Sequence, residues 1–403
     1  MKTILVVSYH FPPEEGSCSE KNTRIVQLLL DQGYRVVVLT KPGIAPVLNN
    51  PNLKIIRTDK AGLFHRNAKK NECADSNNVP NKRNRFKFLS KFIIPDGTID
   101  WVPEVKRLFK RNKILFNDID LILSISSPYS AHLASRFLSR KLNVPYIMSY
   151  GDPWIYEPKR KRGWIRYNIE FQLEKNLINK CDGLLVITDW NKNKYKRLYN
   201  IPEEKISTFH IGYSNEDVLD LPSASNETFN IIYGGSLDPV HRDPLPFIKA
   251  LKRIEGVKIS IFNNDRPDIG QLIKDNGVNE KVMLSPLIRA SDFLKEMYKN
   301  DALLLFGNRT PFQVPGKVFT YIATGKTIIY IKNNNFTDDG TEEVLNKYGN
   351  AIILKNCEDD IIAKINDFLY YNKSRSSIMN KDVFEFHNTM RPICEMIERV
   401  LNK

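Results

Sequence analysis

Short apolar runs alternate with amphipathic segments along the first half of the chain. The runs are continuous rather than alternating, which is typical of strands buried on both faces of a parallel sheet. The predicted strands lie at 3–8, 35–40, 121–126, 145–150 and 183–188, and the predicted helices at 20–32, 131–142 and about 163–180. In the last helix, Ile165, Ile169, Leu173 and Leu177 recur four apart on one face. The pattern predicts an open α/β sheet.

A second series of the same kind follows a polar stretch at 213–230, which contains Pro and Ser and is typical of a linker. Its predicted strands lie at 230–236, 257–264, 282–287, 302–307 and 327–331, and its predicted helices near 269–276, 291–300, 317–323 and at the C-terminus. The sequence therefore predicts two doubly wound, Rossmann-like domains, 1–213 and 214–384, with a last helix at about 385–403 that packs back on the first. A ligand is expected in a cleft at the carboxyl ends of the two sheets.

Composition narrows the class of protein. With 403 residues, 42% of them hydrophobic, the chain is long enough for two globular domains. No apolar run approaches the roughly 18 residues of a membrane span. The five cysteines, at 18, 73, 181, 357 and 394, form no CxxC pair, and the N-terminus lacks a cleavage site. These features predict a cytoplasmic protein without a structural metal or disulfides.

The net charge of +14 is concentrated between Lys82 and Lys113, where ten Lys and Arg face three carboxylates. Bulky apolar side chains are interspersed with them, and a second basic run spans Glu157–Arg166. A solvated basic face explains this pattern most simply. Peripheral docking on an anionic membrane surface is the next explanation, because it needs basic and apolar groups together. Nucleic acid is not expected, since no nucleic-acid module accompanies the charge.

The stretch Val314–Ile331, VPGKVFTYIATGKTIIYI, places a lysine in the first turn of a short helix. The N-terminus of a helix already carries partial positive charge, so Lys317 there makes sense if an anion binds between its amine and free backbone amides. A surface lysine on an ordinary turn is the alternative. Arg242 follows a strand and a Gly-Gly-Ser turn (Gly234–Ser236), and its guanidinium could bind phosphate bidentately. Because both cations follow strands of one sheet, the pattern favours a diphosphate site.

The first half contains three candidate loops. Gly16 and Ser17 precede a helix and could present backbone donors, or form a plain turn; the loop is not GxGxxG, which argues against a dinucleotide. Asp152 and Trp154 follow a strand, where a carboxylate could contact a sugar hydroxyl and an indole could pack on a sugar, or the two could form a turn with a buried indole. His132 lies inside a predicted helix, and a structural role is the simpler reading.

Taken together, these segments resemble glycosyltransferase family 4, the retaining nucleotide-sugar transferases with the two-domain GT-B fold. The resemblance runs through nearly the whole chain. Its carriers are SYHFPPEEGS, IIPDGTIDWVP, SSPYSAHLAS, VPYIMSYGDPW, CDGLLVITDW, IIYGGSLDPVHRDP and VPGKVFTYIATGKTIIYI.

The resemblance implies that the second domain binds the donor and the first binds the acceptor. It implies catalytic roles for Asp152, Arg242 and Lys317, and acceptor contacts from His132, Asp152 and Trp154. The implied donor-binding residues are Gly16, Ser17, Gly235, Ser236, Arg242, Leu287, Gly316, Lys317, Val318, Phe319 and Thr320.

Two positions depart from the family pattern. Thr320 stands where a glutamate usually accepts hydrogen bonds from the nucleotide ribose, and Gly151 stands where an arginine often precedes Asp-Pro-Trp. A hydroxyl carries no charge, and charge-assisted hydrogen bonds are roughly twice as strong as neutral ones. These departures bear on donor affinity and on activity.

The sequence thus predicts a retaining glycosyltransferase that needs no cofactor or bound metal. Its expected donor is a nucleotide-diphosphate sugar, and its expected acceptor a saccharide or lipid-linked saccharide. Bacterial surface polysaccharide synthesis at the inner face of the cytoplasmic membrane is the family-level expectation. A nucleotide-sugar 2-epimerase of the same fold and a non-catalytic saccharide- or partner-binding relative are the alternatives.

Overall fold

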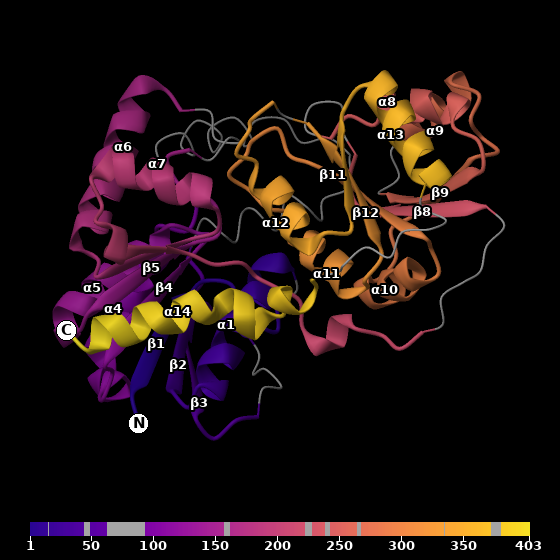
Figure 1. Ribbon diagram of the computed structural model, residues 1–403. Helices are drawn as coiled ribbons and strands as arrows, with labels where there is room; N and C mark the ends of the chain where they lie inside the picture. The colour runs from indigo at the N-terminus through magenta and orange to yellow at the C-terminus, as the bar shows by residue number, and fades with distance from the viewer. Residues whose placement is uncertain are drawn as a thin grey trace, which may run out of the picture. The chain divides into compact units, whose positions relative to one another are not determined.

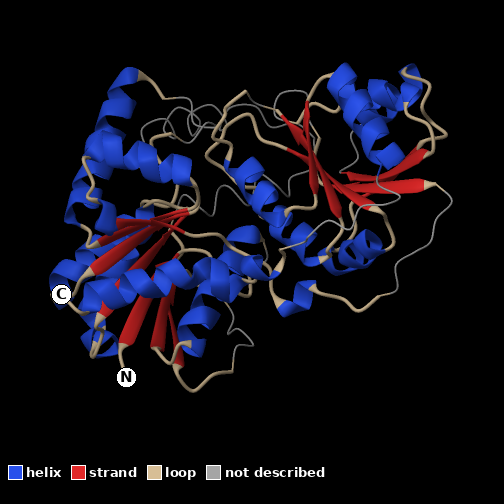
Figure 2. Ribbon diagram, in the orientation of Figure 1, coloured by secondary structure: helices blue, strands red, loops and turns tan. Residues whose placement is uncertain are grey.

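The structure, a computed structural model, describes residues 1–14, 16–43, 49–62, 93–156, 162–221, 228–237, 242–263, 267–333, 335–371 and 380–403. The chain divides into two compact units (Figure 1). Unit 1 comprises Met1–His210 and Met390–Lys403, and unit 2 comprises Ile211–Thr389. In each unit, helices cover a parallel sheet (Figure 2). This arrangement confirms the predicted doubly wound α/β class.

Unit 1 is built on a seven-stranded sheet of order β3-β2-β1-β4-β5-β6-β7. Its strands are β1 (Thr3–Ser8), β2 (Arg35–Thr40), β3 (Leu53–Arg57), β4 (Leu121–Ser126), β5 (Tyr146–Tyr150), β6 (Gly183–Val186) and β7 (Ile206–Thr208). Its helices are α1 (Ser17–Asp31), α4 (Trp101–Arg111), α5 (Ser130–Leu142), α6 (Trp164–Lys180) and α7 (Asp189–Tyr199), joined by most of α14 (Phe386–Leu401). β1 lies inside the sheet, with β2 on one side and β4 on the other.

Unit 2 is built on a six-stranded sheet of order β10-β9-β8-β11-β12-β13. Its strands are β8 (Phe229–Gly234), β9 (Val257–Asn263), β10 (Val282–Pro286), β11 (Ala302–Phe306), β12 (Thr327–Lys332) and β13 (Ala351–Lys355). Its helices are α8 (Leu245–Ala250), α9 (Pro267–Asp275), α10 (Ala290–Tyr298), α11 (Lys317–Ala323), α12 (Gly340–Tyr348) and α13 (Glu358–Tyr371).

The inner strands β8 and β11 of unit 2 are buried on both faces, because successive residues belong to different hydrophobic clusters. Ile231 and Leu304 pack in one cluster, whereas Ile232 and Leu303 pack in the other. This two-sided burial explains why the strands read as continuous apolar runs in the sequence.

Helix α6 is a correction to the simple amphipathic reading. Of the predicted stripe, Leu177 is buried, but Ile165 and Ile169 are 69% and 49% exposed. The helix buries two glutamates instead, Glu170 and Glu174, which are four residues apart. Burial of a carboxylate is costly unless partners compensate for the lost hydration. The partners, which lie on α6, α7 and the loop before α6, are described below.

None of the helices in the described ranges is long and apolar enough to cross a membrane. The four cysteines among the described residues, Cys18, Cys181, Cys357 and Cys394, are free.

Candidate functional site

The strand order of unit 2 reverses between β8 and β11, which makes this pair the topological switch point of the sheet. In a doubly wound sheet, the connections after these two neighbouring strands run to opposite faces, so their loops diverge at the carboxyl edge. Lys317 begins α11, which follows β11, and Arg242 precedes α8, which follows β8. The two candidate cations therefore converge from the two sides of one switch point.

Lys317 reaches back to the end of β8. Its Nζ donates a hydrogen bond to the carbonyl oxygen of Gly234 at 3.0 Å and lies 4.4 Å from the centroid of the Tyr233 ring. Burial of the amine and, secondarily, the positive charge of Arg242 lower the pKa of Lys317 to about 7. A nearby anion favours the protonated, charged form of a lysine whose pKa is lowered in this way. We therefore expect Lys317 to take up a proton when an anionic ligand binds.

The turn after β8 lies close to this amine. Gly235 has a φ of +134°, and a Cβ added there would lie 3.4 Å from Nζ of Lys317 and 3.5 Å from Oη of Tyr233. Oη of Tyr233 donates to the carbonyl oxygen of Ser236 at 2.9 Å, which ties the turn to the strand. A side chain at position 235 would fit in van der Waals contact with the ammonium, but it would strain the backbone, because a φ of +134° is one that glycine alone adopts readily.

Arg242 joins the two loops of the switch point. Its Nη2 lies 3.5 Å from Oδ1 of Asn308, which follows β11. The Arg242 residue is half-buried, and the next residue, Asp243, accepts a hydrogen bond from the backbone N–H of Leu245 at the start of α8. The guanidinium lies close enough to Lys317 for its positive charge to contribute to the lowered pKa of the lysine.

The remaining predicted donor-binding residues of unit 2 fall into two groups. Gly316, Ser236 and Leu287 are exposed, and Thr320 is half-buried. Val318 and Phe319 are core residues, and their N–H groups bond the carbonyl oxygens of Pro315 and Gly316. Helix α11 has seven residues and begins at Lys317, with Gly316 as its N-cap residue.

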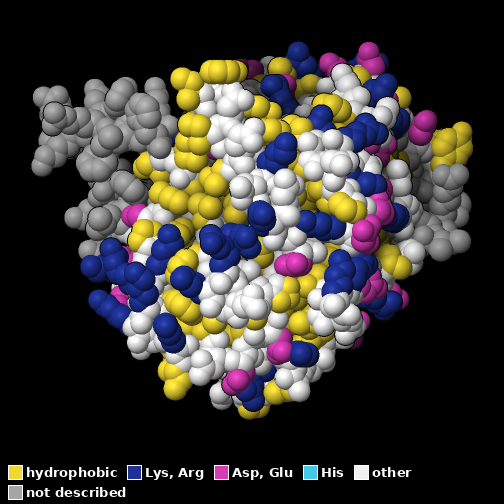
Figure 3. Space-filling model, turned by 90° about the vertical axis from the view of Figure 1, so that its left-hand side faces the viewer, with side chains coloured by type: hydrophobic (Ala, Val, Ile, Leu, Met, Phe, Trp, Pro, Cys, Tyr) yellow, Lys and Arg dark blue, Asp and Glu magenta, His cyan; other side chains and the backbone are white. Residues whose placement is uncertain are grey.

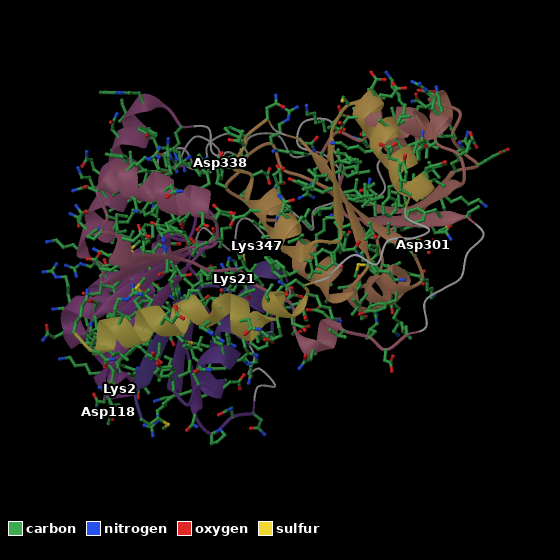
Figure 4. All side chains as sticks on the ribbon, viewed as in Figure 1. Lys2, Lys21, Asp118, Asp301, Asp338 and Lys347 are labelled. Carbon is green, nitrogen blue, oxygen red and sulfur yellow. The ribbon has the colours of Figure 1, made fainter. Side chains whose placement is uncertain are left out.

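Unit 1 has its own switch point, between β1 and β4. Lys21, labelled in Figure 4, comes from α1 and is almost fully buried there. Its Nζ donates to the carbonyl oxygen of Ser126, the last residue of β4, at 2.9 Å. Burial lowers the pKa of Lys21, while Cys18 and Asp152 act in the opposite direction. The lysine thus interacts with Asp152 after β5 and with the end of β4.

Gly151 makes room for this lysine. A Cβ added at position 151 would lie 2.5 Å from Nζ of Lys21 and 3.3 Å from the carbonyl oxygen of Ser126. At the position where the family pattern often has an arginine, this chain therefore has a glycine, and the ammonium group of Lys21 from α1 lies beside it. Nothing in the sequence pattern around Lys21 indicated this role.

Two predicted acceptor residues are buried in unit 1. His132 is fully buried on α5, and its Nδ1 lies 2.7 Å from Oγ of Ser124. Burial of the ring and, to a lesser extent, the positive charge of Lys21 lower the pKa of His132 to about 3. Trp154 is also fully buried, stacked on Tyr129 with ring centroids 5.0 Å apart. Their burial does not support direct contact with an acceptor sugar and favours the structural readings. Asp152 is half-buried at the end of β5.

The glutamates of α6 hold the segment that carries Asp152. Glu170 accepts a hydrogen bond from Nε1 of Trp154 at 3.2 Å and forms ion pairs with Arg162 and Arg166 at 2.7 and 2.6 Å.

Glu174 accepts hydrogen bonds from Oη of Tyr195 at 3.0 Å and from Oη of Tyr199 at 2.6 Å. Oη of Tyr195 in turn accepts from the backbone N–H of Trp154 at 3.2 Å.

These two carboxyl groups titrate differently. Burial raises the pKa of Glu174 to about 7, although the tyrosine hydroxyls oppose the shift. The pKa of Glu170 is lowered; burial would raise it, but its hydrogen bonds and ion pairs with Arg162 and Arg166 prevail. The sequence reading missed both residues, because glutamates in an amphipathic helix are ordinarily solvent-facing.

Gly16 and Ser17 lie at the start of α1 in unit 1. Gly16 is exposed with a φ of +119°, and its carbonyl oxygen accepts from the N–H of Glu20 at 3.1 Å. Their contact with a donor phosphate stays a prediction. Among the described residues no group of His, Cys, Asp and Glu could hold a metal ion.

The sequence and fold of this chain are similar to those of known proteins. Residues 22–216 match the family described as Glycosyltransferase Family 4. None of the curated proteins matches the sequence.

Solved structures share the fold. Sucrose-phosphate synthase from Thermosynechococcus elongatus superimposes with a TM-score of 0.67, at 12% identity over 100% of both chains. Anabaena HepE in complex with UDP gives 0.64, at 11% identity over 99% of this chain and 100% of that one. WaaG, a glycosyltransferase involved in lipopolysaccharide biosynthesis, gives 0.56, at 12% identity over 99% and 98%. These likenesses confirm the predicted GT-B fold.

Proposed function

The chain carries a glycosyltransferase family 4 domain over residues 22–216 within a GT-B fold, and we propose that it is a retaining, metal-independent transferase. It would move a sugar from a nucleotide-diphosphate sugar to a saccharide or lipid-linked saccharide. The observation that carries the proposal is Lys317, held against Gly234 beside Arg242 at the switch point of unit 2.

Transfer from a nucleotide-diphosphate sugar releases a diphosphate, so the developing negative charge needs stabilisation in the transition state. Lys317 and Arg242 would supply that charge, in the role that a metal ion plays in other transferases. Arg242 can contact two oxygens at once, whereas the ammonium of Lys317 acts as a compact point charge. Ser236 and Gly316 would offer backbone contacts around the diphosphate, Leu287 an apolar contact to the base, and Thr320 a hydroxyl to the ribose.

The relatives support a uridine nucleotide as the first donor to try, because HepE was solved with UDP. On the acceptor side, Asp152 is the candidate for hydroxyl contact, with His132 and Trp154 as supports of its loop. Gly16 and Ser17 would meet the donor phosphate.

Membrane association forms part of the proposal. The described part of the Lys82–Lys113 segment exposes Lys106, Arg107, Lys110, Arg111 and Lys113 on and after α4, with residues 82–92 outside the described ranges. Figure 3 shows Lys and Arg side chains gathered beside hydrophobic ones on one face. Such a mixture suits an anionic membrane surface and a lipid-linked acceptor. Because WaaG acts in lipopolysaccharide biosynthesis, surface polysaccharide synthesis is the pathway we propose. More protein should sediment with phosphatidylglycerol vesicles than with neutral vesicles at moderate salt. Equal sedimentation with both would contradict the proposed membrane association but not the proposed transferase activity.

The transferase activity is tested by incubating the protein with UDP-glucose and other nucleotide sugars, with and without glycoside acceptors. Nucleotide release that requires an acceptor, and that falls at least about a hundredfold in Lys317→Ala, is expected. Conversion of the donor sugar without any acceptor would indicate the 2-epimerase alternative. Tight nucleotide binding without turnover would indicate the non-catalytic one.

A further inference from the structure

Three charged residues surround the carboxyl end of β1 in unit 1. His10 lies two residues beyond the strand, Glu14 lies in the following loop, and Lys41 directly follows β2. Nδ1 of His10 is 2.8 Å from Oε2 of Glu14, and Nζ of Lys41 is 2.8 Å from the same oxygen. The cluster stands at the edge where ligands of doubly wound sheets bind.

The backbone that carries His10 is held by buried polar groups. The carbonyl oxygen of His10 accepts from Oγ of Ser8 at 2.9 Å and from Nδ2 of Asn22 at 2.7 Å. The carbonyl oxygen of Tyr9 accepts from Oγ1 of Thr40 at 3.0 Å. Ser8, Asn22 and Thr40 are each no more than 1% exposed, so these bonds are shielded from water. The position of residue 10 is therefore set before any ligand arrives.

The imidazole ring of His10 is also held in one orientation. It packs edge-on against Tyr9, with centroids 5.1 Å apart and an interplanar angle of 81°. Lys41, whose side chain is 9% exposed, also lies 4.9 Å from the centroid of the Tyr9 ring. The imidazole is 27% exposed, so a ligand can reach its outer edge.

The partners of Glu14 determine the tautomer of His10. Hydrogen bonds to Lys41 and His10 lower the pKa of Glu14 against the opposing effect of burial, so this carboxyl group is ionised and can only accept. Nδ1 of His10 must then be the donor. In the neutral ring this leaves the lone pair on Nε2, at the edge of the ring that faces away from Glu14.

We propose that His10 is an acceptor-binding residue whose Nε2 accepts a hydrogen bond from a hydroxyl of the acceptor saccharide. Glu14 and Lys41 are positioning residues that hold the ring and its tautomer. The inference rests on the proposed function, because it assigns the substrate of unit 1 as a polyhydroxylated saccharide. It adds a residue that neither the sequence reading nor the family match assigns.

NMR can report the tautomer of His10 and its contact with a saccharide, because the chain has six histidines and their signals can be told apart. Long-range ¹H–¹⁵N correlation spectra of the full chain, with the His10 signals assigned through His10→Gln, should show the Nδ1–H tautomer. Addition of methyl glucoside, methyl galactoside or methyl N-acetylglucosaminide at saturating concentration should shift Nε2 of His10. His387 is the matched control, since its Nδ1 also meets a glutamate, Glu385, at 2.9 Å but in unit 2; its signals should not move. An Nε2–H tautomer, or no shift of His10 with any glycoside, would overturn the inference whether or not the protein is a transferase.

Kinetics separate this inference from the proposed function. In His10→Ala the KM for the acceptor should rise about tenfold, the effect of one lost hydrogen bond of roughly 1.4 kcal/mol, while donor affinity stays unchanged. His10→Gln, which places an amide near the position of Nε2, should recover part of this loss, and His387→Ala should show none. Equal acceptor KM values in wild type and His10→Ala would refute the role of His10 and leave the transferase intact. A wild-type protein that binds no nucleotide would refute the proposed function, with the role of His10 still decided by the spectra.

Discussion

The Nζ of Lys317 and the carbonyl oxygen of Gly234 lie 3.0 Å apart, which joins the start of α11 to the end of β8 across the switch point of unit 2. A carbonyl oxygen carries only a partial negative charge, so this bond does not fully replace the hydration that the ammonium has lost. A diphosphate would complete the compensation. This relationship is the basis of the predictions for the donor site.

The first prediction concerns proton uptake on binding. Because the pKa of Lys317 is about 7 without a ligand, its amine is largely neutral one pH unit above that value. A bound diphosphate favours the charged form, so binding should take up a proton and weaken by up to about tenfold per pH unit above neutrality. Calorimetry with UDP in buffers of different ionisation enthalpy measures the uptake. Lys317→Arg, whose guanidinium stays charged, should abolish it; unchanged uptake in that variant would assign the proton to another group.

The second prediction concerns Gly235. Gly235→Ala should lower the free energy of unfolding by about 1–3 kcal/mol through its backbone geometry and should also weaken diphosphate binding, because relief of this strain would shift the turn that lies against Nζ of Lys317. The control is Gly256→Ala: this glycine also has a positive φ, +70°, but an added Cβ would meet nothing within 4 Å. Urea unfolding and UDP titration of both variants provide the comparison. Equal losses of affinity in the two variants would contradict a specific effect of the turn beside Lys317.

The third prediction is a pH dependence of stability with opposite signs at two neighbouring glutamates. Glu174 has a folded pKa of about 7 against an ordinary 4.5, so the folded state holds the extra proton between these values. The contribution of Glu174 to the free energy of unfolding therefore falls as the pH rises from 4.5 to about 7, by on the order of 3 kcal/mol in total. Glu174→Gln should flatten the wild-type dependence there.

Glu170 supplies the contrast. Its folded pKa is lowered, so its contribution is present at neutral pH and is lost as pH falls through the folded pKa. Glu170→Gln breaks its buried pairs with Arg162 and Arg166 and should cost about 3–5 kcal/mol at neutral pH, less in acid. Urea unfolding across pH tests both variants. The same pH trend in the two would contradict the assigned charge states.

The fourth prediction couples Gly151 with Lys21. Gly151→Ala should displace Nζ of Lys21 from the carbonyl oxygen of Ser126, which destabilises the loop of Asp152. In a Lys21→Met background the same alanine should cost less, since methionine lacks the amine that lies 2.5 Å away. A double-mutant cycle should give a coupling energy of about 1 kcal/mol or more. Additive effects would show that the two residues do not compete for space.

Some of this arrangement follows from local sequence pattern. The doubly wound sheets could be predicted because strands buried on both faces read as continuous apolar runs, as at Leu121–Ser126. Lys317 and Arg242 could be singled out because each follows a predicted strand, and the strand order then brings them to one edge.

Other features depend on contacts between distant segments. The burial of Glu170 and Glu174 is compensated partly by tyrosines of α7, and no helical periodicity indicates that pairing. The stripe that includes Ile165 and Ile169 predicted a buried face, yet tertiary packing buries another side of α6. Trp154 and His132 carry chemistry that suits a site, but only the structure shows that the core encloses them. β3, β7 and the α12–β13–α13 segment were also absent from the sequence reading.

The central claim, a diphosphate held by Lys317 and Arg242, is tested most directly by calorimetric titration of UDP, GDP, ADP, CMP and dTDP. The variants are Lys317→Ala and Arg242→Ala, with Lys347→Ala as the charge-matched control, since Lys347 is an exposed lysine of unit 2 paired with Glu343. We predict that one diphosphate binds the wild type and the control alike, and that each site variant weakens it at least about tenfold, or 1.4 kcal/mol. No binding by any nucleotide, or equal binding in all four proteins, would contradict the account.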